Sequence, residues 1–294
     1  MVEGKSTIAL PANASHINYS SNTVFSRKSI NQGYSVKYVL SGLEQYEVNG
    51  RRYGVGAGRF LVVGHGSESE VYIKSREAVV GMCLYLNSDL VTDVWNTLKM
   101  NQGQLLDQPA TTERAPALLE QLFSASHTLI GEQLTTLAGH LQQGRVPERY
   151  LTEELFYNLA YSLCQLQQQR LGEMQALPAH KKATREELYR RLCQARDFLH
   201  DNPTEPVSLP QLAEVASLSE YHFLRSFKAA FGATPYHYAL QLRLEQAKAL
   251  LSASQLAIGE IALTCGFNEL QAFAKLFRKA TGLGPLAYRQ QHQK

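Results

Sequence analysis

Short apolar stretches separated by glycine turns occupy residues 34–86 of the chain. The stretches YSVKYVL, LEQYEVNG, RFLVV, EVYIKS and AVVGMCLYL are rich in Val, Tyr and Ile and have the length of β-strands. Asn49 and Gly50 between two of them both tolerate positive φ, which predicts a tight hairpin. Closely spaced strands of this kind predict an antiparallel barrel or sandwich rather than βαβ units.

Helical periodicity begins at Ser88, a candidate N-cap for the segment SDLVTDVWNTLKM. Longer helices are predicted at roughly 115–142 and 148–171, so that helices cover about 88–171. One face of the last helix carries leucines three or four positions apart: Leu151, Leu155, Leu159, Leu163 and Leu166. This leucine stripe fits packing on the barrel or a neighbouring helix, and it equally fits a subunit interface.

A domain boundary is predicted at 177–184, where LPAHKKAT has a proline, a pair of charges and no periodicity. Residues 1–176 then form one domain, 177–184 a linker and 185–294 a second domain. Every segment of the second domain predicts a helix: 185–200, 208–216, 219–231, 235–251, 258–264, 269–280 and a last one from Gly284 or Pro285. The fold class is therefore α+β, with an antiparallel β-domain followed by an all-α domain.

A basic and aromatic segment occurs twice in the second domain, as FLRSFKAAFGATPYHYA from Phe223 and FAKLFRKATGLGPLAYR from Phe273. Matching residues are 50 positions apart within these segments but 49 apart upstream of them. The second copy therefore carries one extra residue before its helix. Each copy predicts a short helix, a tight turn and a second helix capped by Ser219 or by Asn268, which also pairs with Gln271 as in a capping box. This is the pattern of a helix-turn-helix, at about 208–231 and again at about 258–280.

The two phenylalanines of each second helix are four residues apart and predict its buried face. Gly232 and Gly282 have the position of a glycine that ends a helix, and Pro235 opens the next helix. The outward face carries Tyr221, Leu224, Arg225 and Lys228 in the first copy, and Leu270 or Gln271, Ala274, Lys275 and Arg278 in the second. Joined by the helix 235–251, two such units fit successive major-groove segments about 34 Å apart on one face of DNA.

Charge is unevenly distributed along the 294 residues, whose overall net charge is +3. Residues 181–294 hold 15 Lys and Arg against 10 Asp and Glu, whereas residues 1–180 hold 14 against 16. A basic C-terminal segment favours a polyanionic partner. The four scattered cysteines predict reduced thiols, and we expect a cytoplasmic protein without a signal peptide or a membrane span.

Residues 185–294 resemble the DNA-binding domain of the AraC/XylS family of bacterial transcription regulators. The resemblance rests on LAEVASLSEYHFLRSFKAAFGATPYHYALQLRLEQAKALL and on IGEIALTCGFNELQAFAKLFRKATGLGPLAYR. The latter has the family's pattern I-x-x-I-A-x-x-x-G-F, then F-x-[RK]-x-F-[RK] and G-x-x-P-x-x-Y-R. It departs from the family at Gln271 and Ala272, where a serine and an aromatic residue are usual, and at Lys275, where arginine is commoner.

The resemblance implies base contacts from two sets of residues: Tyr221, Leu224 and Arg225 in the first unit, and Gln271, Ala274 and Lys275 in the second. Lys228, Arg278 and Lys279 are candidates for phosphate contacts, with Ser219 capping the first reading helix. Alternatively, Arg225 is solvated or paired within the protein, and Leu224 and Ala274 are merely exposed.

The strands and helices of the first half resemble the cupin-like effector-binding and dimerisation domain of the same family. The histidine positions of metal-binding cupins fall here on Gly64 and Gly66, so we expect no metal, no cofactor and no enzyme. Candidate effector contacts are Tyr38, Tyr46, His65, Tyr72 and Tyr85, each of which also fits an ordinary core or surface residue. The segment before Tyr34, with Tyr19 and Phe25, fits an arm over a pocket as well as a flexible end.

Together these features predict a sequence-specific DNA-binding transcription regulator, with activation as the default. The predicted partners are promoter DNA, RNA polymerase, a small-molecule effector and a second copy in a homodimer. The alternative is a DNA-binding regulator whose barrel is only a dimerisation or protein-interaction scaffold without a ligand.

Overall fold

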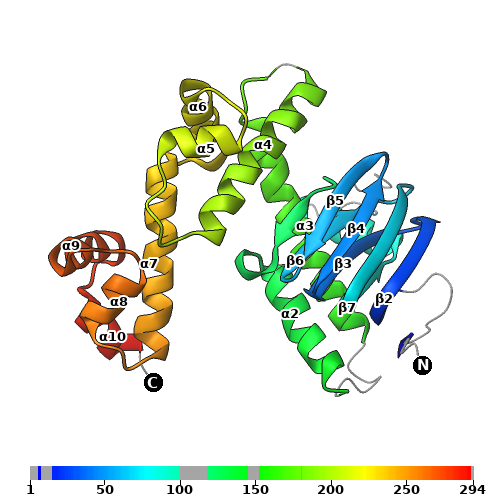
Figure 1. The fold of residues 1–294 in the computed structure, drawn as a ribbon, viewed down its shortest axis with the longest axis horizontal. Helices are drawn as coiled ribbons and strands as arrows, with labels where there is room; N and C mark the ends of the chain where they lie inside the picture. The colour runs from blue at the N-terminus through cyan, green and yellow to red at the C-terminus, as the bar shows by residue number, and fades with distance from the viewer. Residues whose placement is uncertain (1–5, 8–14, 100–117, 145–151, 180, 293–294) are drawn as a thin grey trace, which may run out of the picture. The chain divides into compact units, whose positions relative to one another are not determined.

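The computed structural model describes residues 6–7, 15–99, 118–144, 152–179 and 181–292 (Figure 1). The chain divides into two compact units, residues 1–171 and 172–294. This division falls inside the helix α3 (Glu153–Gln175), a few residues before the linker that the sequence predicts at 177–184. Nowhere in the described ranges is a helix long and apolar enough to span a lipid bilayer.

The first unit is built on an antiparallel sheet that curls into a barrel (Figure 1). Its strands are β1 (Ser6–Thr7), β2 (His16–Ile30), β3 (Tyr34–Ser41), β4 (Leu43–Val48), β5 (Arg51–Gly56), β6 (Arg59–Val63), β7 (Glu68–Leu86) and β8 (Leu122–Ser124). The main order is β1-β2-β7-β3-β6-β8, and β4 joins β7 to β5. The long strand β7 unites two stretches that the sequence separates, EVYIKS and AVVGMCLYL. The predicted antiparallel barrel is confirmed.

The hairpin between β4 and β5 turns at Asn49 and Gly50, as the sequence predicts. Both residues have positive φ, 48° and 77°, and Val48 faces Arg51 across the ladder. This is the geometry of a two-residue turn whose twist matches that of the strands.

The segment before Tyr34 is a barrel strand, which neither sequence interpretation predicted. β2 pairs with β7 from His16 opposite Tyr85 to Ile30 opposite Glu68. Its polar sequence hides this role because many of its side chains are exposed and others line a cavity. The backbone ladder, rather than apolar alternation, holds β2 in the barrel.

The described residues after β7 form β8 and the helices α1 (Ser88–Lys99), α2 (Leu129–Gln142), preceded by the short 3₁₀ helix η1 (Ala125–His127), and α3. Two expectations are corrected here. Asn87 Oδ1, rather than Ser88, accepts hydrogen bonds from the first turn of α1, from Asp89 N at 2.6 Å and Leu90 N at 3.3 Å. The predicted helix 115–142 begins only at Leu129, because Leu122–Ser124 pair with β6 as β8; residues 115–117 lie outside the described ranges.

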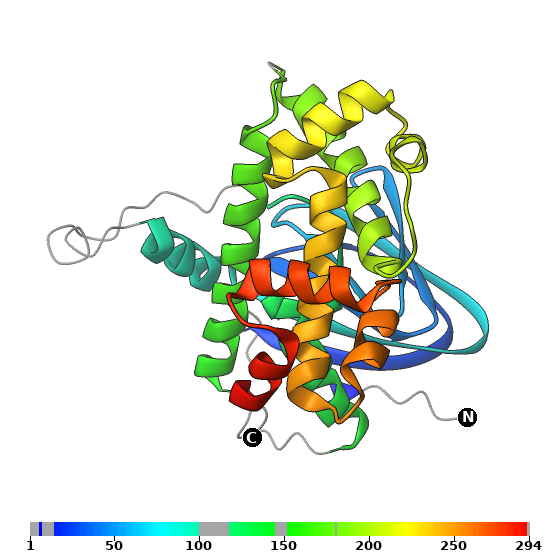
Figure 2. The ribbon, with the colours of Figure 1, turned by 90° about the vertical axis from the view of Figure 1, so that its left-hand side faces the viewer.

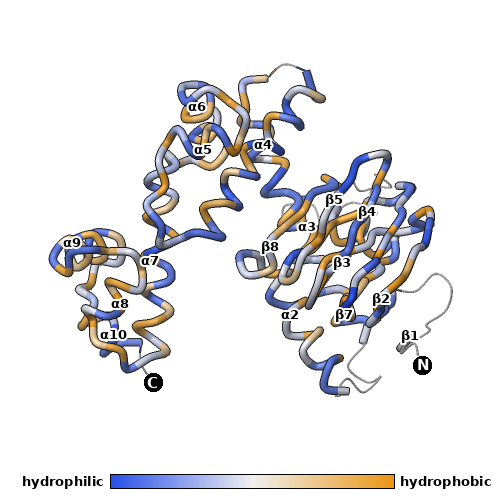
Figure 3. Tube along the Cα trace, viewed as in Figure 1, coloured by the Kyte–Doolittle hydropathy of each residue, from blue (hydrophilic) through white to orange (hydrophobic). Residues whose placement is uncertain are grey.

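The core of the first unit has two parts, one on each side of the β3–β7 surface. Val36, Tyr38, Met82 and Leu84 pack against α1, α2 and α3 on the outside of the barrel. A second cluster, which includes Val39, Val48, Leu61 and Ile73, fills part of the barrel interior. The strands accordingly change between hydrophobic and hydrophilic along their length in Figure 3.

The leucine stripe of α3 belongs to the outer cluster of the first unit. Leu159, Leu163 and Leu166 are buried there and Leu155 packs against it, while Leu151 lies outside the described residues. Packing on the barrel or a neighbouring helix is therefore confirmed for these four leucines, and a subunit interface stays a prediction.

The second unit is helical throughout its described part. Its helices are α4 (Lys182–Asp201), α5 (Leu209–Val215), α6 (Glu220–Phe231), α7 (Pro235–Ala253), α8 (Ile258–Thr264), α9 (Leu270–Thr281) and α10 (Pro285–His292). Their bounds lie within three residues of the predicted ones; α4 begins at Lys182, inside the predicted linker. Figures 1 and 2 show α7 running between the α5–α6 pair and the α8–α9 pair.

Candidate functional site

Each helix pair of the second unit has the same aromatic contact in its own core. The ring centroids of Phe227 and Tyr238 lie 5.6 Å apart at an interplanar angle of 88°. Their counterparts fifty residues later, Phe277 and Tyr288, lie 5.3 Å apart at 86°. Edge-to-face rings at this distance attract one another beyond the burial of their area. The repeated sequence therefore reproduces a repeated geometry.

The turn within each pair also repeats, at an offset of 49. Ser217 and Gly266 both have positive φ, and the next amide in each copy bonds back to the first helix, from Leu218 N to Ala213 O and from Phe267 N to Ala262 O, both at 2.9 Å. This is the 6→1 bond that ends a helix in a Schellman motif.

Ser219 caps α6 as predicted, since its side chain accepts from His222 N. The cap predicted for the second copy is wrong. Glu269, not Asn268, occupies the N-cap position of α9, and it makes no side-chain cap hydrogen bond. Asn268 is therefore the extra residue of the second copy, inserted between the turn and the helix.

An arginine from the preceding helix binds each turn. Arg191 Nη1 of α4 donates to Ser217 O at 3.2 Å, and Arg243 Nη1 of α7 donates to Gly266 O at 3.1 Å. Arg243 also donates to the carbonyl oxygens of Pro203 and Glu205, at 2.8 and 2.9 Å. The structural repeat thus includes α4 and α7, which comparison of the two repeated sequence segments did not reveal.

The outward faces of α6 and α9 carry the predicted DNA-binding residues. Tyr221 is 76% exposed and Leu224 37%, although both have large apolar side chains. Ala274 is half-buried, and the remaining predicted side chains are exposed: Ser219, Arg225, Lys228, Gln271, Lys275, Arg278 and Lys279. Phe223 and Phe227, like Phe273 and Phe277, are fully buried on the opposite face. The structure therefore brings each predicted set onto one face of its helix.

Hydrogen bonding separates the arginines of the second unit into two groups. Six bind protein acceptors: Arg185, Arg190, Arg191, Arg196, Arg243 and Arg289. Arg225 on α6 and Arg278 on α9 make no hydrogen bond or ion pair with any described residue. This argues against an intramolecular partner for Arg225 and leaves one uncompensated guanidinium on each of the two helices.

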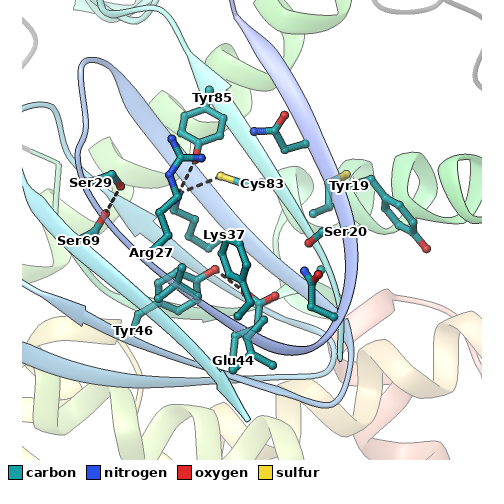
Figure 4. A pocket seen from close by; sticks show the side chains of 17 residues that line it. Tyr19, Ser20, Arg27, Ser29, Lys37, Glu44, Tyr46, Ser69, Cys83 and Tyr85 are labelled. Atoms are coloured by element: carbon teal, nitrogen blue, oxygen red, sulfur yellow. Dashed lines mark hydrogen bonds between the residues drawn. The ribbon is translucent and has the colours of Figure 1, made fainter. Parts of the chain in front are cut away.

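A cavity of about 250 Å³, with both polar and apolar side chains in its wall, opens inside the barrel of the first unit (Figure 4). β2 contributes Asn18, Arg27 and Ser29 to its wall, β3 contributes Lys37, β4 contributes Glu44 and Tyr46, and β7 contributes Ser69, Cys83 and Tyr85. An adjoining space of about 400 Å³ shares Asn18, Arg27, Ser29 and Tyr85 with it. Ligand cavities commonly place a few polar groups in such a wall.

Lys37 is buried at the centre of the cavity wall. Its Nζ donates to Cys83 Sγ at 3.0 Å and to Tyr85 Oη at 3.2 Å, and it lies 4.6 Å from the centre of the Tyr85 ring. Burial lowers the pKa of Lys37, but its interactions with Cys83 and Tyr85 outweigh burial and raise that pKa above its usual value. The electrostatic effect of Cys83, with burial, raises the pKa of Tyr85 to about 12.

Glu44 is the second buried charged residue of this wall, and Tyr46 Oη donates to its Oε2. Burial raises the pKa of Glu44 above its usual value, although the Tyr46 hydrogen bond and Lys37 act in the opposite direction. Gly81 of β7 makes room for this carboxylate, because a Cβ at Gly81 would collide with Glu44 Oε1.

The five predicted effector contacts fall into two groups. Tyr46 and Tyr85 line the cavity. Tyr38 lies on the other face of β3, buried against the helices, and its hydroxyl bonds to Thr135 Oγ1 at 3.1 Å. Exposed His65 contacts Gln32 O through Nδ1 at 2.8 Å, and Tyr72 is 47% exposed. The structure does not bring these last three residues to the cavity.

Sequence reasoning missed Lys37, Glu44 and Arg27. The available signal was a lysine in the middle of the apolar strand YSVKYVL, together with a glutamate two residues before Tyr46 and hence on the same face. In the described ranges, no three His, Cys, Asp or Glu side chains gather as metal ligands would.

Family profiles match both units. One described as "AraC-like ligand binding domain" matches residues 14–160, and one described as "Helix-turn-helix domain" matches residues 212–291. The MmsAB operon regulatory protein of Pseudomonas aeruginosa is 36% identical over 95 residues, which cover 32% of this chain and 30% of that protein. The HTH-type transcriptional activator RhaS of Yersinia pseudotuberculosis is 32% identical over 147 residues, which cover 50% of this chain and 49% of that protein.

Among solved structures, ToxT from Vibrio cholerae is 12% identical with a TM-score of 0.34, over 96% of this chain and all of that chain. The chain spans about a third to a half of the length of the curated relatives that it matches. The ligand-binding profile alone covers half of the chain, and the helix-turn-helix profile covers the two repeated helix pairs. The chain therefore belongs to the AraC family of DNA-binding transcription regulators.

Proposed function

We propose that this regulator reads promoter DNA with α6 and α9 and responds to a small molecule held in the barrel cavity. The observation that carries the proposal is the pair of uncompensated guanidinium groups, Arg225 and Arg278, in a unit whose other arginines bind protein acceptors. Unpaired cations on exposed helix faces suit phosphate oxygens and guanine edges.

The two helix-turn-helix pairs, α5–α6 and α8–α9, make different base contacts. In the first, Tyr221, Leu224 and Arg225 read bases; in the second, Gln271, Ala274 and Lys275 do so. Lys228, Arg278 and Lys279 bind phosphates. Support comes from the exposure of these side chains and from the inserted Asn268, which changes the start of α9 relative to α6. The half-sites therefore differ in sequence.

Effector control is supported by the buried charges in the barrel. Lys37 and Glu44 are costly to bury in a barrel that serves only as a scaffold, and both face a cavity. The protein then acts in the cytoplasm as a homodimer, and it activates transcription through RNA polymerase. RhaS, a relative named as a transcriptional activator, favours activation over repression.

The test starts from the DNA that the full chain selects from a random pool. Footprinting with Arg225→Ala and Lys275→Ala is expected to lose base preference at two different positions, about one helical turn apart. Lys182→Ala is the control, because this exposed lysine of α4 pairs with Glu186 away from both reading faces. Unchanged selectivity in both variants would refute the assignment of α6 and α9 as reading helices.

Effector control has its own test in a reporter fused to the selected DNA. Cells that express either wild type or a Lys37→Met variant are grown in media that differ in their small-molecule content, and reporter expression is compared. Expression that varies with the medium in wild type alone supports a sensor. Equal expression from both proteins under every condition favours the alternative, a barrel that is only a dimerisation or protein-interaction scaffold.

A further inference from the structure

We propose that the barrel cavity takes a small organic acid, whose carboxylate binds Lys37 and Arg27 and whose hydroxyl group, or an equivalent hydrogen-bond donor, binds Glu44. The proposal rests on the proposed sensor function and names the chemical class of its ligand.

Lys37 forms no ion pair with any described residue, although Glu44 lies near enough to interact with it electrostatically. Its two hydrogen bonds go to the Cys83 sulfur and the Tyr85 hydroxyl rather than to a carboxylate. Buried ammonium groups are normally paired with an anion, because leaving water is otherwise too costly. A ligand carboxylate at Nζ supplies this counter-charge.

Arg27 adds a second positive charge at the rim. It is exposed, lines both the cavity and the adjoining space, and has no hydrogen-bond or ion-pair partner among the described residues. Figure 4 shows Arg27 and Lys37 extending toward Tyr85 from β2 and β3. A guanidinium fork beside an ammonium group is suited to the two oxygens of a carboxylate.

Two residues of the cavity wall, Glu44 and Asn18, have acceptor oxygens that can take further donors. Glu44 lies away from Tyr85 in Figure 4, and one of its oxygens already accepts from Tyr46. The Oδ1 atom of Asn18, which also lines the cavity, is buried without a hydrogen-bond partner. A ligand hydroxyl satisfies such acceptors, whereas a purely apolar tail leaves them unpaired.

These charges disfavour two other ligand classes. A cationic ligand would be repelled by the positive charges of Lys37 and Arg27. A neutral sugar would satisfy Glu44 but leave the Lys37 ammonium without a counter-ion. The cavity, at about 250 Å³, is smaller than the 300–1,000 Å³ typical of drug-sized ligands, which favours a compact acid.

Thermal unfolding of the full chain tests the proposal with matched probes at constant ionic strength. Sodium lactate, gluconate and galacturonate are compared with sodium chloride and with the neutral counterparts propane-1,2-diol, glucitol and galactose. A ligand that binds the folded state raises Tm with concentration. At least one acid is expected to raise Tm above both chloride and its neutral counterpart. Sodium propionate, which lacks the hydroxyl of lactate, reports the contribution of Glu44.

Variants assign any shift to the cavity. Arg27→Gln and Lys37→Met are each expected to weaken the apparent affinity for the acid at least tenfold. Lys28→Gln, one residue along β2, is the control: Lys28 pairs with Glu68 at 3.5 Å and does not line the cavity. Because Arg27 is exposed, its variant remains informative even where Lys37→Met fails to fold.

Three results would overturn the proposal: no acid raises Tm above chloride, the neutral counterparts raise it equally, or the shift persists in both cavity variants. Stabilisation by a neutral polyol that depends on Glu44 would refute the acid while preserving a sensor. Failure of the full chain to select any DNA would instead refute the proposed function, independently of the thermal shifts.

Discussion

Arg243 donates from Nη1 to the carbonyl oxygen of Gly266, and through it α7 holds the turn of the second helix pair. The same guanidinium binds the carbonyl oxygens of Pro203 and Glu205 in the loop before α5, so it joins the loop of the first pair to the turn of the second. Arg243 thus links the helix pairs that contain α6 and α9, the proposed reading helices, through backbone acceptors alone. A rigid spacing between two reading helices is what two adjacent half-sites require.

Replacing Arg243 with Met is expected to lower the free energy of unfolding by roughly 1.5–3 kcal/mol, because the hydrogen bonds of a charged donor are lost. It should also weaken binding to DNA with both half-sites more than to DNA with one. Urea denaturation and gel-shift titration measure the two effects. Arg191→Met is the matched control, since Arg191 binds the turn at Ser217 but makes no bond to any described residue of the second pair. Equal loss on both DNAs would remove Arg243 from the control of spacing.

Gly266 is expected to tolerate alanine much less well than Gly232. Both have positive φ, at which an L side chain costs about 1–2 kcal/mol. At Gly266 a Cβ would also lie 2.6 Å from the carbonyl oxygen of Thr204, whereas a Cβ at Gly232 meets nothing within 4 Å. Gly266→Ala should therefore lower the unfolding free energy measured in urea clearly more than Gly232→Ala. Similar losses in the two variants would contradict the prediction, because they would show that the loop at Thr204 moves away from the new Cβ at little cost.

In the barrel, Gly81→Ala is expected to displace the carboxylate of Glu44, because the new Cβ would collide with Oε1. Overpacking of this kind costs about 1–3 kcal/mol. In a Glu44→Ala background the same substitution has room and should cost much less. A double-mutant cycle in urea measures this coupling. Strict additivity of the two substitutions would mean that Gly81 and Glu44 do not compete for space.

The raised pKa of Glu44 predicts a pH-dependent difference between wild type and Glu44→Gln. Burial makes the folded state bind the proton more tightly than the unfolded state does, so Glu44 favours the folded state less as pH rises from the usual glutamate pKa through its raised value. The unfolding free energy of wild type minus that of Glu44→Gln should therefore fall with rising pH across this interval and stay flat above it. Urea titrations from pH 4 to pH 8 measure it. A difference that increases with pH would show that the folded state favours the ionised form.

The sequence predicted the helical unit closely because each local signal there agrees with the packing. Phe227, Gly232, Pro235 and Tyr238 recur fifty residues later, and each has one physical role in both copies. The inserted residue was also detectable. Its consequence, a helix capped at Glu269 rather than Asn268, was not, because a good capping residue is not always used as one.

The barrel was harder to predict because both faces of its central strand are covered. On β3, Val36 and Tyr38 face the helices, while Lys37 faces the cavity. Alternation shows which residues share a face, but it does not show which face is the interior when helices cover the other. Residue type alone therefore pointed to the tyrosines, and of the four predicted ones only Tyr46 and Tyr85 line the cavity.

On DNA, Arg225 and Lys279 are expected to behave differently. Arg225→Ala should cost about 1–3 kcal/mol on the selected site and relax the preference at one base position. Lys279→Ala should weaken binding to all sequences and lower the salt slope of log K by about one, because one phosphate contact is lost. Binding titrations on selected and random DNA between 50 and 200 mM salt measure both effects. Equal loss on both DNAs for Arg225→Ala would assign this guanidinium to a phosphate, and an unaltered slope for Lys279→Ala would place Lys279 outside the interface.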